Sequence, residues 1–243
     1  ALSVDTGFDF SQSVAADVNV PQGRFEAVAD RTAFFDRLAD RVRMAPGVTH
    51  VCLTNEVPLD RGPGSMSFVP EGERRLRSAL PTTVSPGCAD LLQVPLVEGR
   101  WFTRAEPAPS VVVSLAMARL LFPDGRSAVG QRIHFGLPDG PLMTVVGVSA
   151  DVRLASLEAA ASPVVWMPHD LGYFTPKRLL VRYAAGGIAD ELALRTALRD
   201  VDPELALANL RSLDDIVARS TASRRFALFL LGGFALTALV GVA

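Results

Sequence analysis

Apolar and polar residues near the start of the chain follow a pattern that predicts a β-α-β unit. Residues 13–20 alternate, which is typical of a half-buried strand, and Pro21 ends this strand. Residues 26–45 carry apolar side chains at helical spacing with charged residues between them, and Pro46 stops the helix. Residues 48–53 then form an apolar run that predicts a second strand.

A second unit of the same kind lies near the end of the chain. Residues 178–183 predict a strand, and residues 188–201 predict an amphipathic helix whose apolar face uses Ile188, Leu192, Leu198 and Val201. Residues 205–210 return as a strand. Two separated β-α-β units predict a split ferredoxin-like α+β subdomain, since right-handed crossovers allow them to pack into one sheet.

The stretch between the two units has a different pattern of apolar and polar residues. It contains several short apolar runs, which predict strands near residues 67, 82–84, 110–113, 131–135, 143–151 and 163–167. Short helices are expected only near residues 89–94 and 114–122. We therefore expect a discontinuous β-α-β subdomain made of residues 1–80 and 171–222, interrupted by a β-rich subdomain at residues 81–170.

The last 18 residues, 226–243, carry no charged side chain and raise the mean hydropathy of the chain to +0.27. As a helix they would span about 27 Å, which is close to the thickness of the hydrocarbon layer. We expect a truncated transmembrane helix here, in a fragment of a larger membrane protein; the alternative is a buried helix of the core. Ser212 is expected to cap a short helix, with Asp215 three residues later, that leads into this segment.

Composition narrows the class of protein. The chain has 243 residues, a net charge of −2 and 49% apolar residues, which excludes a disordered chain and argues against nucleic-acid binding driven by net charge. The only cysteines, Cys52 and Cys88, lie 36 positions apart without metal-like spacing. They are either two free thiols or one disulfide, and two buried free thiols are the simpler interpretation.

Catalytic and cofactor-binding patterns do not assemble. The single lysine, Lys177, lacks the glycine-rich loop of a P-loop nucleotide site. The histidines His50, His134 and His169 have no second metal ligand at helical spacing, and no nucleophile elbow is present. We therefore predict no catalytic residues, no cofactor and no metal site, and we expect Asp151 and Arg153 to form a surface ion pair.

Six short motifs resemble, in order, the MacB-type periplasmic core domain of FtsX/MacB-like ABC transporter permeases. They are VSPG at 84–87, VPLVEGRWF at 94–102, ARLLFP at 118–123, VGQRI at 129–133, VVGVSADVR at 145–153 and PVVWMP at 163–168. The resemblance spans nearly the whole chain. Cys88 stands where that family usually has an aromatic residue, and Ser114 begins a departure from its usual Asn-Glu pair.

The resemblance implies a porter-like β-α-β subdomain with a β-rich insertion, lying outside the cytoplasmic membrane between two transmembrane helices. It also implies a non-enzymatic role, in which the domain relays ATP-driven conformational change in export to substrates or to a periplasmic partner protein. The implied partners are a cytoplasmic ATP-binding subunit or domain and the remaining transmembrane helices, in a dimeric or pseudo-dimeric parent protein. Arg224 and Arg225, taken alone, would instead place the domain in the cytoplasm.

Two other functions remain open from the residues alone. A membrane-anchored module that binds a small molecule or peptide would show an apolar pocket with converging polar groups. A membrane-tethered hydrolase would need a perturbed acid, base or nucleophile in a cleft, and the sequence contains no such set of residues.

Overall fold

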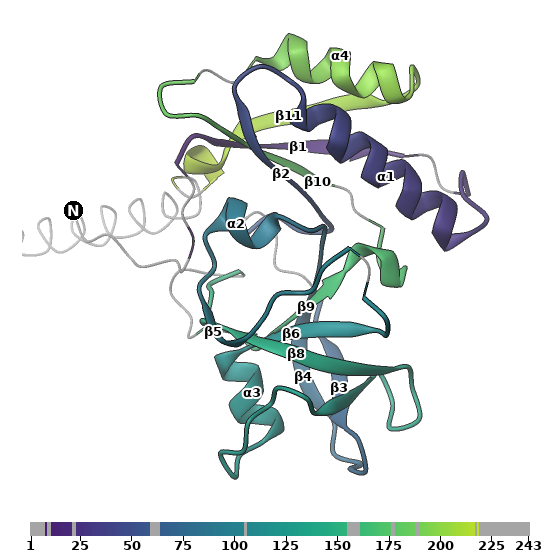
Figure 1. The fold of residues 1–243 in the computed structure, drawn as a ribbon, viewed down its shortest axis with the longest axis vertical. Coiled ribbons are helices and arrows are strands. Elements are labelled where there is room, and N and C mark those ends of the chain that lie inside the picture. The colour runs from purple at the N-terminus through teal and green to yellow at the C-terminus, as the bar shows by residue number, and fades with distance from the viewer. Residues whose placement is uncertain are drawn as a thin grey trace, which may run out of the picture.

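The computed structural model describes residues 8, 11–20, 23–58, 64–104, 106–154, 161–175, 178–187, 190–216 and 218. These residues form two groups of elements, one above the other in Figure 1. We call the upper group the sheet lobe and the lower group the barrel lobe. The chain runs from the sheet lobe into the barrel lobe and then returns.

The sheet lobe contains two β-α-β units. The first is β1 (Ser13–Asn19), α1 (Val28–Arg43) and β2 (Val48–Thr54); the second is β10 (Arg178–Tyr183), α4 (Glu191–Val201) and β11 (Ala206–Ser212). Their strands form one antiparallel sheet in the order β11-β1-β10-β2. The predicted strands and helices at these places are confirmed to within a few residues. Both helices lie in the upper part of Figure 1 with this sheet, and they contact each other.

Strand alternation divides the sheet lobe into two apolar faces. On β2, Val51 and Leu53 pack with α1 and α4, whereas Cys52 between them points to the opposite face. On β10, Leu180 likewise belongs to that opposite face. Successive side chains of a strand point to opposite sides, so each strand serves two cores. The sheet is therefore covered by helices on one face and is free to pack against the barrel lobe with the other.

The barrel lobe is a ring of hydrogen-bonded strands. Its strands are β3 (Met66–Pro70), β4 (Arg77–Val84), β6 (Ser110–Ser114), β7 (Arg132–Phe135), β8 (Leu142–Ser149) and β9 (Val164–Pro168). The order β4-β3-β7-β8-β6-β9 closes because β9 also pairs with β4. The short strand β5 (Leu96–Gly99) adds to the outside of β8, and the helix α3 (Leu115–Leu121) packs near β6. Closing the ring leaves few free edges.

A third apolar core lies between the two lobes. On β9, Val165 and Met167 point into the ring, whereas Val164 and Trp166 point out of it and join Cys52 and Leu180 of the sheet lobe. Helix α2 (Cys88–Leu92) contributes the buried side chains Cys88, Leu91 and Leu92 to the same core. Among the described residues, strand pairing between the lobes occurs only at the ends of β2 and β4, where Thr54 pairs with Val84. The lobes are thus joined mainly by side-chain packing.

One prediction about helix faces was wrong. Leu192 is 75% exposed, and α4 instead buries Leu194, Ala197 and Leu198. These buried residues lie three and four positions apart, so they share a stripe that excludes Leu192. Asp190 begins the helix, since its carboxylate accepts a hydrogen bond from the backbone N–H of Ala193 at 3.0 Å.

Several predictions concern residues outside the described ranges. These are the proposed membrane segment at 226–243, Ile188, Lys177, Arg224 and Arg225. Within the described ranges, no helix has both the length and the apolar character needed to cross a membrane. The predicted cap at Ser212 is present, because its hydroxyl accepts a hydrogen bond from the backbone N–H of Asp214 at 3.1 Å.

Candidate functional site

Helix α1 presents two carboxylates beside its buried face. The face that packs on the sheet buries Phe35 and Leu38 completely, together with Phe34, Ala39 and Val42. Asp36 and Asp40 are four residues apart, so they lie on the same side of the helix, one turn from each other. This side of α1 contacts the segment that leaves the barrel lobe after β9.

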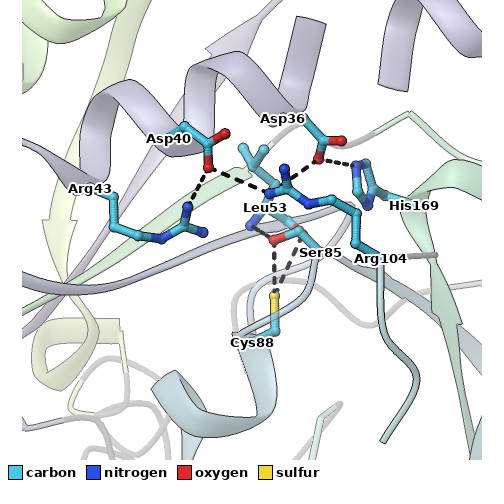
Figure 2. Close-up of polar contacts among 8 residues, drawn as sticks. All are labelled: Asp36, Asp40, Arg43, Leu53, Ser85, Cys88, Arg104 and His169. Atoms are coloured by element: carbon cyan, nitrogen blue, oxygen red, sulfur yellow. Dashed lines mark hydrogen bonds and ion pairs between the residues drawn. The ribbon is translucent and has the colours of Figure 1, made fainter. Parts of the chain in front are cut away.

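Four side chains meet at this contact, and we call them the clasp: Asp36, Asp40, Arg104 and His169 (Figure 2). His169 Nε2 lies 3.1 Å from Asp36 Oδ1. The guanidinium of Arg104 lies 3.7 Å from Asp36 Oδ1 and 3.4 Å from Asp40 Oδ1. His169 opens the 3-10 helix η1 (His169–Leu171) after β9, and Arg104 comes from the loop between β5 and β6. The clasp therefore joins η1 and the loop between β5 and β6, which both belong to the barrel side, to helix α1 of the sheet lobe.

The loop that carries Arg104 is held by Glu106. The Glu106 carboxylate accepts hydrogen bonds from Arg100 at 2.6 and 2.9 Å and from the backbone N–H of Thr103 at 2.7 Å. The hydrogen bonds from Arg100, followed by those from Thr103, outweigh burial and lower the pKa of Glu106 to about 2. Bidentate pairing of this kind fixes geometry as well as charge. Glu106 thus fixes the part of the loop next to Arg104.

His169 is nearly inaccessible to solvent. Its side chain is 3% exposed, and burial lowers the pKa of the imidazole from its ordinary value of 6.5 despite the nearby carboxylates of Asp36 and Asp170. Burial also raises the pKa of Asp170. The imidazole is therefore neutral near pH 7, and a neutral ring that lies beside a carboxylate carries its proton on the nitrogen that faces it.

A second contact lies one turn earlier on α1. Arg31 donates hydrogen bonds to the carbonyl oxygen of Gly172 at 2.7 Å and to the hydroxyl of Thr175 at 3.3 Å. Gly172 has a φ of 77°, and a Cβ placed there would lie 2.7 Å from Val28. Only glycine permits this approach of the connecting segment to α1.

Another part of the lobe junction is covalently closed. Cys52 of β2 and Cys88 of α2 form a disulfide, so the simpler interpretation of two free thiols was wrong. Both sulfurs are buried in the core between the lobes. The hydroxyl of Ser85 accepts a hydrogen bond from the backbone N–H of Leu53 at 2.9 Å and lies 3.6 Å from Cys88 Sγ, as Figure 2 shows. A structural disulfide is typical of proteins that fold in oxidising compartments.

Most side chains singled out in the sequence have structural roles. His134 Nδ1 lies 2.8 Å from the carbonyl oxygen of Gly140, and His50 lies on β2 beside Thr49. Asp151 accepts a hydrogen bond from the backbone N–H of Ala116 at 2.6 Å and thus supports the start of α3. No cluster of metal-ligating side chains is present among the described residues. Of the three histidines, only His169 belongs to the clasp.

The clasp was missed by sequence reasoning. Asp36 and His169 lie 133 positions apart, and no motif links them. The acidic pair on α1 was the only local signal, because Asp36 and Asp40 share one side of a predicted helix. Arg41, on an exposed part of α1, pairs with Asp200 of α4.

The surface of the described residues has hollows of different size. One hollow, of about 440 Å³, lies between the end of α1 and α4, where Met44 and Leu192 are exposed. Another, of about 120 Å³, lies beside α2 near Trp101 and Phe102. Trp101 packs edge to face against Trp166 with the ring centres 5.8 Å apart, so it anchors the loop to the core between the lobes.

Comparison with known proteins identifies the fold. The periplasmic region of MacB from Actinobacillus actinomycetemcomitans is similar, with a TM-score of 0.59 and 14% identity over 90% of this chain and 96% of that one. A domain of a putative permease protein from Porphyromonas gingivalis is also similar, with a TM-score of 0.54 and 17% identity over 85% of this chain and 93% of that one. The extracellular domain of the noncanonic ABC-type transporter YknZ from Gram-positive bacteria has a TM-score of 0.50 and 15% identity, over 80% of this chain and 100% of that one.

No curated protein matches the sequence. The sequence model described as MacB-like periplasmic core domain matches residues 3–213, which include both β-α-β units and the strands between them. This match covers far more than half of the chain and agrees with the motifs in the middle of the sequence. The chain therefore belongs to the MacB-like periplasmic core domain family, the family of the extracytoplasmic domains of MacB-like ABC transporter permeases.

Proposed function

We propose that this chain is a non-catalytic domain that transmits ATP-driven conformational change across the extracytoplasmic side of an ABC transporter permease. The ATP-binding partner lies in the cytoplasm, and the domain passes the change on to an exported substrate or to a periplasmic partner protein. Family membership supports the location and the class of parent protein. The parent protein is proposed to be dimeric or pseudo-dimeric.

The observation that carries the proposal is the unequal junction between the lobes. Each lobe has its own buried core, so each can move as a unit. A disulfide and an apolar core fix one part of the junction, whereas charged side chains form the clasp at α1. A domain that transmits conformational change needs two arrangements of its lobes. A junction that is fixed in one part and polar in another permits two such arrangements.

The strand order supports a ferredoxin-like, porter-type assignment of the sheet lobe. The order β11-β1-β10-β2, with a helix after β1 and after β10, is the order of a split pair of β-α-β units. We also propose the discontinuous division of the chain into two subdomains. Because β3 and β4 pair with β7 and β9, we place the start of the inserted subdomain near residue 64 instead of 81.

Location outside the cytoplasm and attachment to the membrane complete the proposal. The buried disulfide is consistent with an oxidising compartment. Residues 226–243 are proposed to begin the transmembrane helix that follows the domain, on the basis of their uncharged apolar sequence. Movement of the sheet lobe, which ends in β11 and the segment capped by Ser212, would then follow movement of that helix.

The experiment that tests this function locks the clasp in the parent permease, reconstituted in vesicles with its ATPase. Asp40→Cys and Arg104→Cys are joined by a short bis-maleimide; the native cysteines do not react because they are in a disulfide. We expect transport to fall by at least about tenfold while ATP is still bound. Each single variant, treated with the same reagent, is the control. Unchanged transport in the bridged protein, or ATP hydrolysis by this chain alone, would contradict the proposal.

A further inference from the structure

We propose that the clasp is pH-sensitive: it holds the two lobes together while His169 is neutral and loosens when His169 takes up a proton. The inference concerns this chain alone and does not depend on the transport function. It rests on the position of the imidazole between the lobes, on the hydrogen-bonding state of its two nitrogens, and on the charges that face it.

The two ring nitrogens have unequal surroundings. Nε2 lies 3.1 Å from Asp36 Oδ1, so the neutral ring donates its single proton there. Nδ1 is buried and has no hydrogen-bond partner among the described residues. A second proton would therefore form a buried N–H without an acceptor, which is unfavourable while the clasp is closed.

The charged groups that act on the ring come from α1, from η1 and from the loop after β5. Asp36 faces it from α1, Asp170 is its neighbour on η1, and Arg104 approaches from the loop after β5. The carboxylates favour a charged imidazole and Arg104 opposes it. Arg31, on α1, is engaged with Gly172 and Thr175 further along the connecting segment.

The direction of the pH effect follows from burial. Burial is the largest influence on the pKa of His169 and lowers it from 6.5, whereas an imidazole released into water would return to that value. The loosened arrangement therefore binds the proton more tightly, and acidification below 6.5 favours loosening. Asp170 acts in the opposite sense, because its pKa is raised above 3.8 in the closed clasp and it takes up a proton there more readily.

Loosening would leave the rest of the junction in place. The disulfide between Cys52 and Cys88 does not titrate, and the described side chains that form the core around Trp166 are apolar. Movement would therefore be a rotation about that part of the junction, opening the contact between α1 and η1. This is a change that a distance between the lobes can report.

The test uses the full 243-residue chain in detergent micelles. Azide-bearing amino acids replace Leu137 in the barrel lobe and Leu192 in the sheet lobe, which are 62% and 75% exposed, and carry a donor and an acceptor dye. The energy transfer is measured from about pH 7.5 to about pH 5, together with the ring resonances of His169 by NMR.

We expect a reversible fall in transfer efficiency below pH 6.5, and a titration midpoint of His169 below that of the same residue in the urea-unfolded chain. His169→Gln keeps an amide donor toward Asp36 and should abolish the fall, whereas the control His134→Gln should retain it. Asp170→Asn should leave the His169 response in place and remove the opposing effect.

Three results would overturn the inference. One is a transfer efficiency that does not change with pH, and another is the same fall in His169→Gln. The third is a His169 midpoint at or above that of the unfolded chain. The NMR measurement needs no variant at position 169, so failure of that variant to fold does not rescue the inference.

Discussion

The two parts of the lobe junction differ in chemistry. Around the disulfide, the lobes share a closed apolar core that includes Trp166, Leu180 and Leu91. At α1 they meet through the charged clasp, in which Arg104 is 47% exposed. Separating an apolar core costs free energy in proportion to the area that was buried. A partly exposed ion pair contributes little free energy, and this contribution depends on solvent conditions. The first part therefore fixes the lobes, and the second adds a smaller contribution that changes with solvent conditions.

The largest expected effect comes from the shared core. Trp166→Ala removes a ring that is 1% exposed and packs against Trp101, and it leaves a cavity between the lobes. We expect the free energy of unfolding to fall by about 3–5 kcal/mol, measured by urea denaturation. Leu137→Ala, at a site 62% exposed, is the control and should change it by less than about 0.5 kcal/mol. A Trp166 variant as stable as the control would show that this core does not join the lobes.

Removal of the disulfide should come next. Cys52→Ala with Cys88→Ala opens a covalent loop across 36 positions, and we expect a loss of about 2–4 kcal/mol in the free energy of unfolding. Thermal unfolding in the presence and absence of reductant checks this. Reductant should leave the double variant unchanged. If wild type and double variant unfold at the same temperature without reductant, the covalent part of the account is wrong.

Glu106 should make the protein acid-sensitive. Its pKa of about 2 lies below the ordinary 4.5, so its contribution is complete above pH 4.5 and is lost as the pH falls toward 2. Glu106→Gln should lose about 1 kcal/mol at pH 7 and should have a flatter pH dependence between those values. Glu98→Gln, at an exposed strand, is the matched control. The same steep acid dependence in Glu106→Gln would refute the role of this carboxylate.

Arg104→Ala should have the smallest effect on stability. We expect less than about 1 kcal/mol, because the side chain is half exposed and its partners are 3.4 and 3.7 Å away. Hydrogen exchange should nevertheless become faster in η1 and in the loop after β5, since these segments are held to α1 through the clasp. Arg119→Ala on α3 is the comparison. Equal rates of hydrogen exchange in both variants would show that Arg104 does not hold these segments to α1.

Local patterns predicted much of the sheet lobe. The alternation in β1 and the helical spacing in α1 depend on residues close in sequence, and both appear as expected. The strand β5 was missed because all four of its residues are exposed and show no alternation. Helical spacing from Ile188 predicts that Leu192 is buried, but the buried stripe of α4 runs through Leu194, Ala197 and Leu198 instead.

The junction could not be predicted because it depends on contacts between distant residues. Cysteine spacing left the pairing of Cys52 and Cys88 open, and only the packing of α2 on β2 brings the sulfurs together. His169 gave no sign of its partner Asp36, since neither lies in a chemical motif. The resemblance of the middle motifs to the MacB-type family gave the family and the general location, and it gave no information on the clasp.

The most direct test of the account is the distribution of distances between the lobes. Single-molecule energy transfer between dyes at positions 137 and 192 would compare wild type with the variant Asp36→Asn/Arg104→Ala at pH 7.5, with the disulfide oxidised in both. The account predicts one narrow distribution for wild type and a broader one, shifted to longer distances, for the variant at nearly unchanged stability. The same narrow distribution in both proteins would show that the clasp does not hold the lobes together.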